Sequence, residues 1–540
     1  MSRYGELSKA ELVAQLEQRD RRDATRFGLV WEARAADRDA ALNADFIALD
    51  LDTELSCGNT PWRNLIVEGD NYDALRHLRM AFAGRVKCIY IDPPYNTGNR
   101  DFVYNDHFLD REDAWRHSKW CDFMFRRLQL AKRLLAPDGA IFVSIDDNEL
   151  FTLGMLMNRV FGENAHVATC VWQKRYSREN RGAIGDAHEY LLVYSPQPDL
   201  FKERRGRIVL TEQQAKVYTN PNSDPAGPWA TVSMNAQGYR PNQMYDIVSP
   251  NGKVHRPPEG RCWAMLESEF LKLKAKGKIH WGKDGNGVPR IIRYLHEVEG
   301  VVPWTWWPHE EVGHTDEARK EIRKWLETQT AFETPKPVRL IERVLQIAAT
   351  EPDDLVLDFF AGSGTTAHAV HKVNAADGGH RRCILVSNTE ATTDDPEKNL
   401  CRDVCAKRVR RVIEGFNGTP GLGGDFAYLR CRRVPAGRLL HLDHAAIWTA
   451  LQLIHCNRLA PYVAEAPYQL AEEDGQALVY VPRFRRTDAA TLRQRLDAVT
   501  SATVFSWQPD ALRQQVPGSH VQHESAAEYL SRKFATGANA

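Results

Sequence analysis

From residue 64 onward, short apolar runs that stop at turn residues alternate with longer stretches whose apolar positions lie three or four apart. The first pattern predicts buried strands and the second predicts amphipathic helices. Strands are predicted at the start of 64–78, in 87–98, 140–146 and 188–195, at the start of 354–373, and in 381–390. Helices are predicted at the end of 64–78, in 120–139 and 336–350, at the end of 354–373, and in 402–416. This alternation predicts an α/β fold with a largely parallel sheet.

Three other regions break the alternation. Between about 196 and 330 the periodicity dissolves into segments rich in Pro, Gly, Asn and Trp, such as NPNSDPAGPW and VVPWTWWPHE. Residues 425–540 contain two further apolar runs around a short helix, and 7–26 carries leucines at near-helical spacing. The predicted organisation is therefore an N-terminal helical segment (1–60), two halves of one α/β domain (61–195 and 331–420), an insertion between them (196–330) and a C-terminal α/β module (421–540).

Composition narrows the class of protein only a little. The 540 residues include 71 Lys plus Arg and 71 Asp plus Glu, so the formal net charge is +0 and a polybasic tail protein is excluded. No charge-free apolar run approaches the ~20 residues of a membrane span, and the first residues lack the apolar core of a secretory signal. Ten cysteines form no CxxC pair, and Cys401 and Cys405 are expected to be buried free thiols. We expect a cytoplasmic protein with no membrane association and no metal site.

The first motif with chemical content is Asp92-Pro93-Pro94-Tyr95, directly after an apolar strand. Ligands of open α/β sheets bind at the carboxyl ends of strands. Two prolines remove backbone donors and leave carbonyl acceptors, Asp92 adds a carboxylate, and Tyr95 adds a flat aromatic face. Acceptors beside a stacking ring suit the exocyclic amine of a planar base. A strand-ending turn with a packed tyrosine is the plainer interpretation, and the strand directly ahead makes it the less favoured one.

The second motif runs from Asp358 to Thr366 (DFFAGSGTT), between a predicted strand and a predicted helix. Gly362 and Gly364 permit a tight turn, and the helix N-terminus offers free N–H groups to a carboxylate. The motif is neither the GxGxxG dinucleotide fingerprint nor a phosphate loop. Taken alone, a GxG segment is more often a structural turn. One strand later, Glu390 stands where an acid at a strand tip would hold ribose hydroxyls.

Together the two motifs resemble the DNA methyltransferases of the beta class that modify adenine and use S-adenosylmethionine. IYIDPPYNTG ahead of FFAGSG is the permuted motif order of that class, and HEYLLVYS, FETPKPVRLIERVL and the NTE and RDVCAKRVRRVIEGF segments resemble modification subunits of type III restriction systems. The resemblance covers roughly 64–195 and 310–416. It implies a Rossmann-like S-adenosylmethionine-dependent methyltransferase sheet in permuted order, with an inserted target-recognition region and a C-terminal α/β module.

The resemblance also implies roles for individual residues. Asp92 and the Pro93 carbonyl accept hydrogen bonds from the amine of the target adenine, with Pro94 stiffening the loop and Tyr95 stacking on the flipped base. The residues implied to bind the cofactor are Asp70, Lys336, Asp358, Phe360, Gly362, Gly364, Thr365 and Glu390. Asp70 and Lys336 have equally simple structural explanations, namely a helix cap and a solvated charge.

The insertion and its approach are the expected target-recognition region. Segment 171–210 carries eight basic residues against five acidic ones, a net charge of +3, beside Trp172 and Tyr176. Such an excess suits contacts with DNA phosphates, although a charge run is usually a solvated face. The residues expected to contact DNA are Lys174, Arg175, Arg178, Arg204 and Arg205.

The sequence therefore predicts a site-specific enzyme that methylates the N6 amine of adenine in double-stranded DNA, with S-adenosylmethionine as cofactor. A homodimer and a restriction endonuclease subunit are the expected partners. Methylation of cytosine N4 is the nearest alternative, because the two amines are chemically alike; Asp rather than Ser before Pro-Pro-Tyr favours adenine. A non-catalytic DNA-recognition subunit is a second alternative, disfavoured by the presence of both motifs.

Overall fold

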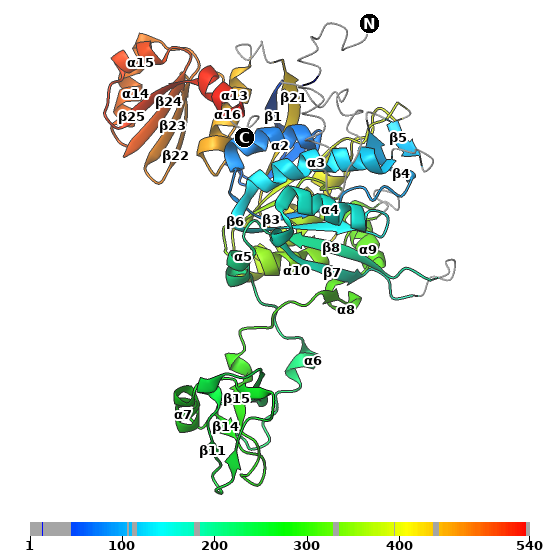
Figure 1. Cartoon of the computed structure of the whole chain (residues 1–540). Helices are drawn as coiled ribbons and strands as arrows, with labels where there is room; N and C mark the ends of the chain where they lie inside the picture. The colour runs from blue at the N-terminus through cyan, green and yellow to red at the C-terminus, as the bar shows by residue number, and fades with distance from the viewer. Residues whose placement is uncertain are drawn as a thin grey trace. The chain divides into compact units, whose positions relative to one another are not determined.

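The computed structural model describes residues 45–104, 107–110, 116–177, 184–327, 334–393, 395–435 and 442–535, together with Val13. The chain forms two compact units: Arg207–Pro303, and a larger unit made of the residues before and after it. Figure 1 colours both by residue number. The helix predicted over 7–26 lies outside the described residues, apart from Val13.

A ten-stranded mixed sheet forms the centre of the larger unit. In spatial order its strands are β1 (Phe46–Cys57), β21 (Phe426–Val434), β2 (Leu65–Glu68), β18 (Arg382–Ser387), β17 (Leu355–Asp358), β3 (Val86–Ile91), β6 (Leu135–Ile145), β8 (His188–Tyr194), β7 (His166–Gln173) and β16 (Trp306–Trp307). The six strands from β21 to β6 are parallel, whereas β1 and β8 run antiparallel to their neighbours. The α/β fold with a largely parallel sheet is thus confirmed.

Helices cover both faces of this sheet (Figure 1). One face packs against α2 (Asn71–Phe82), α3 (Arg116–Leu134) and α4 (Leu150–Phe161). The other packs against α10 (Val338–Ala348), α11 (Thr365–Asp377), the π-helical turn η5 (Cys401–Ala406) and α12 (Lys407–Glu414). Apolar side chains buried on both sides explain why the central strands are near-continuous hydrophobic runs. Cys401 and Cys405 are both buried and free.

The two outer strands β1 and β21 correct the predicted boundaries. The predicted N-terminal helical segment 1–60 contains β1, and the predicted C-terminal module 421–540 contains β21, which pairs with both β1 and β2. Both strands carry charged residues (FIALDLDTELSC and FAYLRCRRV); β1 is the edge strand of the sheet and β21 lies next to it. Their apolar positions are buried by partners more than three hundred residues away, which local periodicity cannot reveal.

The smaller unit, Arg207–Pro303, has its own core of Met234, Ile247, Trp263, Phe270 and Ile279. It is narrower than the predicted insertion 196–330, because the flanking residues pack into the larger unit. Its elements are α6 (Glu212–Ala215), β9 (Trp229–Ser233), β10 (Asn235–Gln237), η3 (Pro241–Gln243), β11 (Ile247–Val248), β12 (Val254–His255), β13 (Arg261–Trp263), α7 (Glu267–Ala275), β14 (Ile279–His280), β15 (Arg290–Tyr294) and η4 (Leu295–Glu297). Strands this short give no clear period in the sequence.

The C-terminal residues form a four-stranded sheet of β22 (Gln469–Glu473), β23 (Gln476–Val481), β24 (Ser501–Ser506) and β25 (Val521–Ser525). It is preceded by α13 (His444–His455), which contacts β1, so the module packs on the edge of the central sheet. The remaining elements are η2 (Glu163–Ala165), η7 (Arg486–Asp488), α5 (Pro198–Arg204), α8 (His309–Val312), α9 (Thr315–Leu326), α14 (Ala489–Leu496), α15 (Pro509–Gln515), α16 (Ala526–Ala535) and the two hairpins β4–β5 (Asn99–Tyr104, His107–Asp110) and β19–β20 (Gly415–Phe416, Thr419–Pro420). Within the described part of the chain, no helix combines the length and the apolar character that a membrane crossing requires.

Candidate active site

The two motifs lie at the same edge of the sheet. Strands β3 and β17 are parallel neighbours, with Leu357 opposite Ile89, so Asp358 and Asp92 both stand at the carboxyl ends of adjacent strands. The next strands lie on opposite sides, since β18 follows β17 on one side and β6 follows β3 on the other. This reversal is a topological switch point, where the sheet leaves a crevice for a ligand.

The loop after β3 is held by bonds that leave two acceptors at its head. Trp120 Nε1 donates to the Pro94 carbonyl at 2.7 Å, and the buried Asn96, at φ 57°, donates from its side chain to Glu149 at 2.6 Å. Asn is one of the few residues that adopt positive φ readily. Within the residues that the structure describes, no group donates to the Pro93 carbonyl. The loop therefore presents this carbonyl together with the Asp92 carboxylate.

Lys336 connects the acceptor loop to the segment before α10. Its Nζ lies 2.8 Å and 2.7 Å from the two carboxylate oxygens of Asp92, and its side chain is only 8% exposed. The structure therefore rejects the solvated-charge explanation for this lysine. The Lys336 backbone carbonyl also accepts from Thr365 Oγ1 at 3.4 Å, which joins the same segment to the glycine loop.

Glu189 on β8 completes the charged cluster, and the sequence had given it no role. The Tyr95 hydroxyl lies 2.8 Å from Asp92 Oδ1 and 3.0 Å from Glu189 Oε2, and Lys336 Nζ lies 3.5 Å from the same glutamate oxygen. The second glutamate oxygen is 3.4 Å from Lys174 Nζ. One feature of the sequence pointed to Glu189: it is the second residue of the apolar strand HEYLLVY. A carboxylate in such a strand needs a partner.

Burial and pairing set the charges of the cluster. Burial raises the pKa of Asp92, the nearby Glu189 carboxylate adds to the rise, and Lys336 opposes both. Burial disfavours the charged form of Lys336, but Asp92 and Glu189 outweigh it and raise the pKa of the ammonium. Burial likewise opposes ionisation of Glu189, yet Lys336 and Lys174 bring its pKa below the ordinary value. A charged lysine thus stands between two carboxylates.

The loop after β17 is organised around Asp358. Its carboxylate accepts from the Phe360 N–H at 3.0 Å and from Thr366 Oγ1 at 2.5 Å, and burial raises the pKa of this carboxyl to about 7. At Gly364 the backbone has φ 76°, and an added Cβ would lie 3.1 Å from Val409 and 3.2 Å from the Cys405 carbonyl. Both the backbone conformation and the close contacts therefore favour glycine there. Gly362, at φ 48°, makes the preceding turn.

A fully buried arginine on α12 supports this loop from beneath. The guanidinium of Arg408 donates to the Ser363 hydroxyl at 3.1 Å, to the Ser363 carbonyl at 3.3 Å and to Thr365 Oγ1 at 2.9 Å. The sequence placed this residue only on an amphipathic helix. Nothing local distinguishes it from the surface arginines beside it, because its role depends on a loop more than forty residues away.

The other predicted cofactor residues surround the same edge. Asp70 caps α2 by accepting from Tyr72 N and Asp73 N, as its simpler explanation required, and it also pairs with Arg127 at 2.8 Å. Glu390 follows β18, adopts φ 52° and pairs with Lys398 at 2.9 Å. Phe360 packs against the core with its ring 6.0 Å from that of Phe123. Roles in cofactor binding stay predictions for these three residues.

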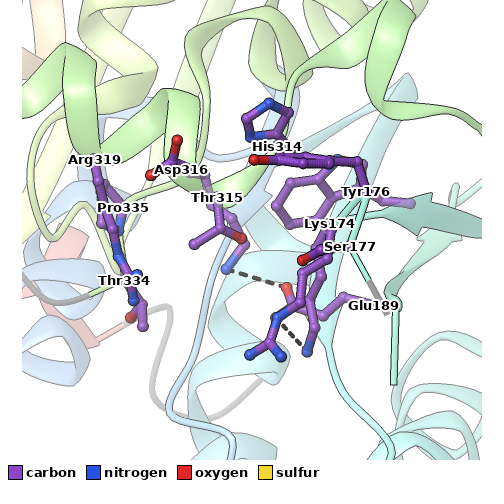
Figure 2. Close-up of a pocket in the computed structure, with 13 residues that line it drawn as sticks. Lys174, Tyr176, Ser177, Glu189, His314, Thr315, Asp316, Arg319, Thr334 and Pro335 are labelled. Carbon is purple, nitrogen blue, oxygen red and sulfur yellow. Dashed lines mark ion pairs between the residues drawn. The ribbon is translucent and has the colours of Figure 1, made fainter. Parts of the chain in front are cut away.

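A cavity of about 430 Å³ opens beside the charged cluster. Figure 2 shows Lys174, Tyr176 and Glu189 on one side of it and Thr315, Asp316 and Arg319 of α9 on another. Its lining consists of Trp172, Lys174, Arg175, Tyr176, Ser177, Glu189, His314, Thr315, Asp316, Arg319, Thr334, Pro335 and Lys336. The aromatic and charged side chains of this wall suit a flat, polar ligand.

The residues predicted to contact DNA do not share one surface. Lys174 is mostly buried, and its ammonium lies 3.0 Å from Asp186 as well as 3.4 Å from Glu189, so it belongs to the charged cluster. Arg175 lines the cavity beside it. Arg204 ends α5 and is exposed, whereas Arg205 follows it and is half-buried. Arg178 lies outside the described residues.

Fold and site together define an open α/β protein whose switch point carries an amine-acceptor loop beside a glycine loop. The chain belongs to the DNA methylase family, whose pattern matches residues 86–376, more than half of the chain.

Three curated relatives are similar to this chain. The Mod subunit of the type III restriction-modification enzyme StyLTI from Salmonella typhimurium is 36% identical over 72% of this chain and 62% of its own length. The EcoPI Mod subunit of Escherichia phage P1 is 33% identical over 61% of this chain and 58% of its own length. The type II methyltransferase M.KpnI of Klebsiella pneumoniae is 30% identical over 60% of this chain and 80% of its own length. The chain thus spans about three fifths of the length of the two Mod subunits.

Proposed function

We propose that this chain methylates the N6 amine of adenine at specific sites in double-stranded DNA, using S-adenosylmethionine, as the modification component of a restriction-modification system. The observation that carries the proposal is the pairing of β3 with β17, which places Asp92 and the Pro93 carbonyl beside the loop of Gly362 and Gly364. Membership of the DNA methylase family supports it.

The loop after β17 fits such a cofactor. At Gly364 an added Cβ would lie only 3.1 Å from Val409, and the first N–H groups of α11 have no acceptor inside the helix. These groups suit a carboxylate, while the acids at the strand tips, Asp358 and Glu390, suit an ammonium group and hydroxyls. When bound, S-adenosylmethionine supplies an activated methyl group on a sulfonium.

The acceptor loop supplies what the substrate amine lacks. The lone pair of an adenine amine is delocalised into the ring, so the nitrogen is a weak nucleophile. Hydrogen bonds from its two N–H groups to Asp92 and to the Pro93 carbonyl favour a pyramidal nitrogen and stabilise the positive charge that develops on it. Tyr95 offers a ring for the base after it leaves the duplex, an event that costs a few kcal/mol.

The smaller unit Arg207–Pro303 is the proposed site of target recognition. It has its own core and interrupts the larger unit between α5 and β16, so its interior can vary without disturbing the core of the sheet. The type III Mod relatives support a restriction endonuclease subunit as partner. A homodimer acting in the cytoplasm completes the proposal.

Expression in a host without DNA methylation, followed by long-read sequencing of modified bases, tests the function directly. We expect N6-methyladenine within one short sequence motif, abolished by Asp92→Ala. The variant should retain cofactor binding by calorimetry, because Asp92 belongs to the acceptor loop. Asp353→Ala, at an exposed carboxylate, is the matched control and should leave the methylation pattern intact.

Each alternative gives a different result in the same experiment. N4-methylcytosine in the wild-type sample would establish the cytosine alternative. Motif-specific DNA binding without any modified base would establish a recognition subunit without catalysis. Full modification by Asp92→Ala would remove the acceptor loop from the mechanism.

A further inference from the structure

The carboxylate that has to accept a substrate amine is already occupied. Both oxygens of Asp92 face the Lys336 ammonium, at 2.8 Å and 2.7 Å, and one of them also faces the Tyr95 hydroxyl at 2.8 Å. An ionised carboxylate accepts through about four lone pairs, and the lysine and the tyrosine together engage most of those on Asp92. A cation in contact with it also cancels much of the negative potential that would stabilise a developing positive charge.

A second carboxylate stands ready for both donors. Glu189 Oε2 lies 3.5 Å from Lys336 Nζ and 3.0 Å from the Tyr95 hydroxyl. The side chain is nearly buried, and Lys174 holds its other oxygen at 3.4 Å. A displacement of less than 1 Å toward Glu189 would bring the ammonium to hydrogen-bond distance from that carboxylate and lengthen its contacts with Asp92.

Tyr95 has the same choice between the two acids. A phenol has one proton, so its hydroxyl donates to Asp92 or to Glu189 but not to both at once. If Tyr95 and Lys336 both turn to Glu189, Asp92 regains the lone pairs that an incoming amine needs. One residue on β8 thus offers an alternative acceptor to every donor that the structure places on Asp92.

We propose that Glu189 is a positioning residue: it takes over Lys336 and Tyr95 when the substrate amine binds, and so frees Asp92 to act as acceptor. The inference rests on the proposed function, because it assigns Asp92 to an amine. Without Glu189 the lysine has no second carboxylate in the cluster and stays on Asp92. Figure 2 shows Glu189 at the cavity wall, next to Lys174, where this exchange would take place.

Glu189→Gln keeps the size of the side chain and removes its charge. Turnover should fall about 10- to 100-fold, since the acceptor is no longer freed, while the dissociation constant of the cofactor should stay within about twofold. In a Lys336→Met background the same substitution should change turnover less than about twofold, because the ammonium is then absent and only the Tyr95 hydroxyl contacts Asp92. Equal losses in both backgrounds would overturn the proposal, as would wild-type turnover of Glu189→Gln. Glu351→Gln, an exposed residue, is the control.

A binding measurement covers the case in which Lys336→Met has no turnover. DNA carrying adenine at the target position is compared with DNA carrying purine, which lacks the exocyclic amine. Wild-type protein should prefer adenine, and Glu189→Gln should lose that preference; an unchanged preference would overturn the proposal. Wild-type protein that methylates no DNA would instead refute the proposed function itself.

Discussion

Replacing Arg408 with Met tests whether the buried guanidinium holds the cofactor loop in shape. The residue is fully buried, and burial lowers its pKa to about 10, so it is still charged at neutral pH. Its donors reach the hydroxyl and carbonyl of Ser363 and the hydroxyl of Thr365. Met has a similar length and fills the space without offering a donor.

The expected size of the effect follows from the groups left behind. A buried polar group that loses its partner costs about 1–3 kcal/mol, so the three groups on Ser363 and Thr365 together put about 3–9 kcal/mol at stake. The loop can relax and recover part of this free energy. That relaxation moves Ser363 and Thr365 away from the conformation that the cofactor needs. If only about 1.4 kcal/mol falls on binding, the affinity drops about tenfold.

Calorimetric titration with S-adenosylmethionine measures the change, and thermal unfolding with and without the cofactor shows how much of the cost falls on the fold. We expect cofactor affinity to fall about tenfold or more, by the same reasoning. Arg402→Met is the control, since Arg402 lies just upstream on η5 and pairs at the surface with Asp403. If both variants bind the cofactor as tightly as wild type, Arg408 does not support the loop.

Four further outcomes are expected. Gly364→Val should weaken cofactor binding in calorimetry, because a side chain there combines an unfavourable φ with close contacts. Unchanged affinity would show that this loop does not bind the cofactor. An Arg204→Ala/Arg205→Ala variant should bind DNA with a shallower dependence on salt, as expected when phosphate contacts are lost, and an equal slope would place both residues outside the interface. Burial raises the pKa of Asp358 from its ordinary 3.8 to about 7, so the native state keeps a proton that the unfolded chain releases. The wild type should therefore lose stability relative to Asp358→Asn as the pH rises from 3.8 to about 7. A difference in the free energy of unfolding that stays constant over this pH range, measured with denaturant, would contradict this. Replacing 209–300 with a short turn should preserve cofactor binding and abolish motif-specific methylation, and retained specificity would move recognition elsewhere.

The central part of the fold could be predicted because its strands are buried on both faces. Strands β2, β8, β17 and β18 fall within segments that the hydrophobic pattern assigned to strands, and β3 begins one residue before its segment. Strand β6 overlaps its predicted segment 140–146 but begins at Leu135, inside the predicted helix 120–139. The edge strand β1 and its neighbour β21 could not be placed, because their charged alternate positions hide a pairing between the two ends of the chain. Strand β7 was missed for a related reason, since its first residues are exposed.

The residues of the site also divide into those that the sequence could predict and those that it could not. Asp92 and Gly364 lie in contiguous motifs whose backbone geometry the local sequence dictates, so their position at strand ends could be predicted. Glu189, Lys336 and Arg408 act through partners on other elements, and each of them has an ordinary local setting: a strand, a loop and a helix. Lys336 shows the limit most clearly, because sequence alone left it between a ligand and a solvated charge, whereas its ammonium is buried on Asp92.

The permuted order separates the two loops of the site in the sequence and leaves room for a separate unit between them. The acceptor loop and the glycine loop are neighbours in the sheet but far apart in sequence, so the connection between the two halves has to leave the sheet in any case. The inserted unit closes on itself where Ile208 and Val301 exchange backbone hydrogen bonds of 2.9 Å and 2.8 Å. Extra residues beyond such a closed neck add little to the entropy cost of joining the halves, because that cost grows only slowly with loop length. Changes within the unit therefore leave the register of β3 and β17, and with it the distance between acceptor and cofactor loop, unaffected.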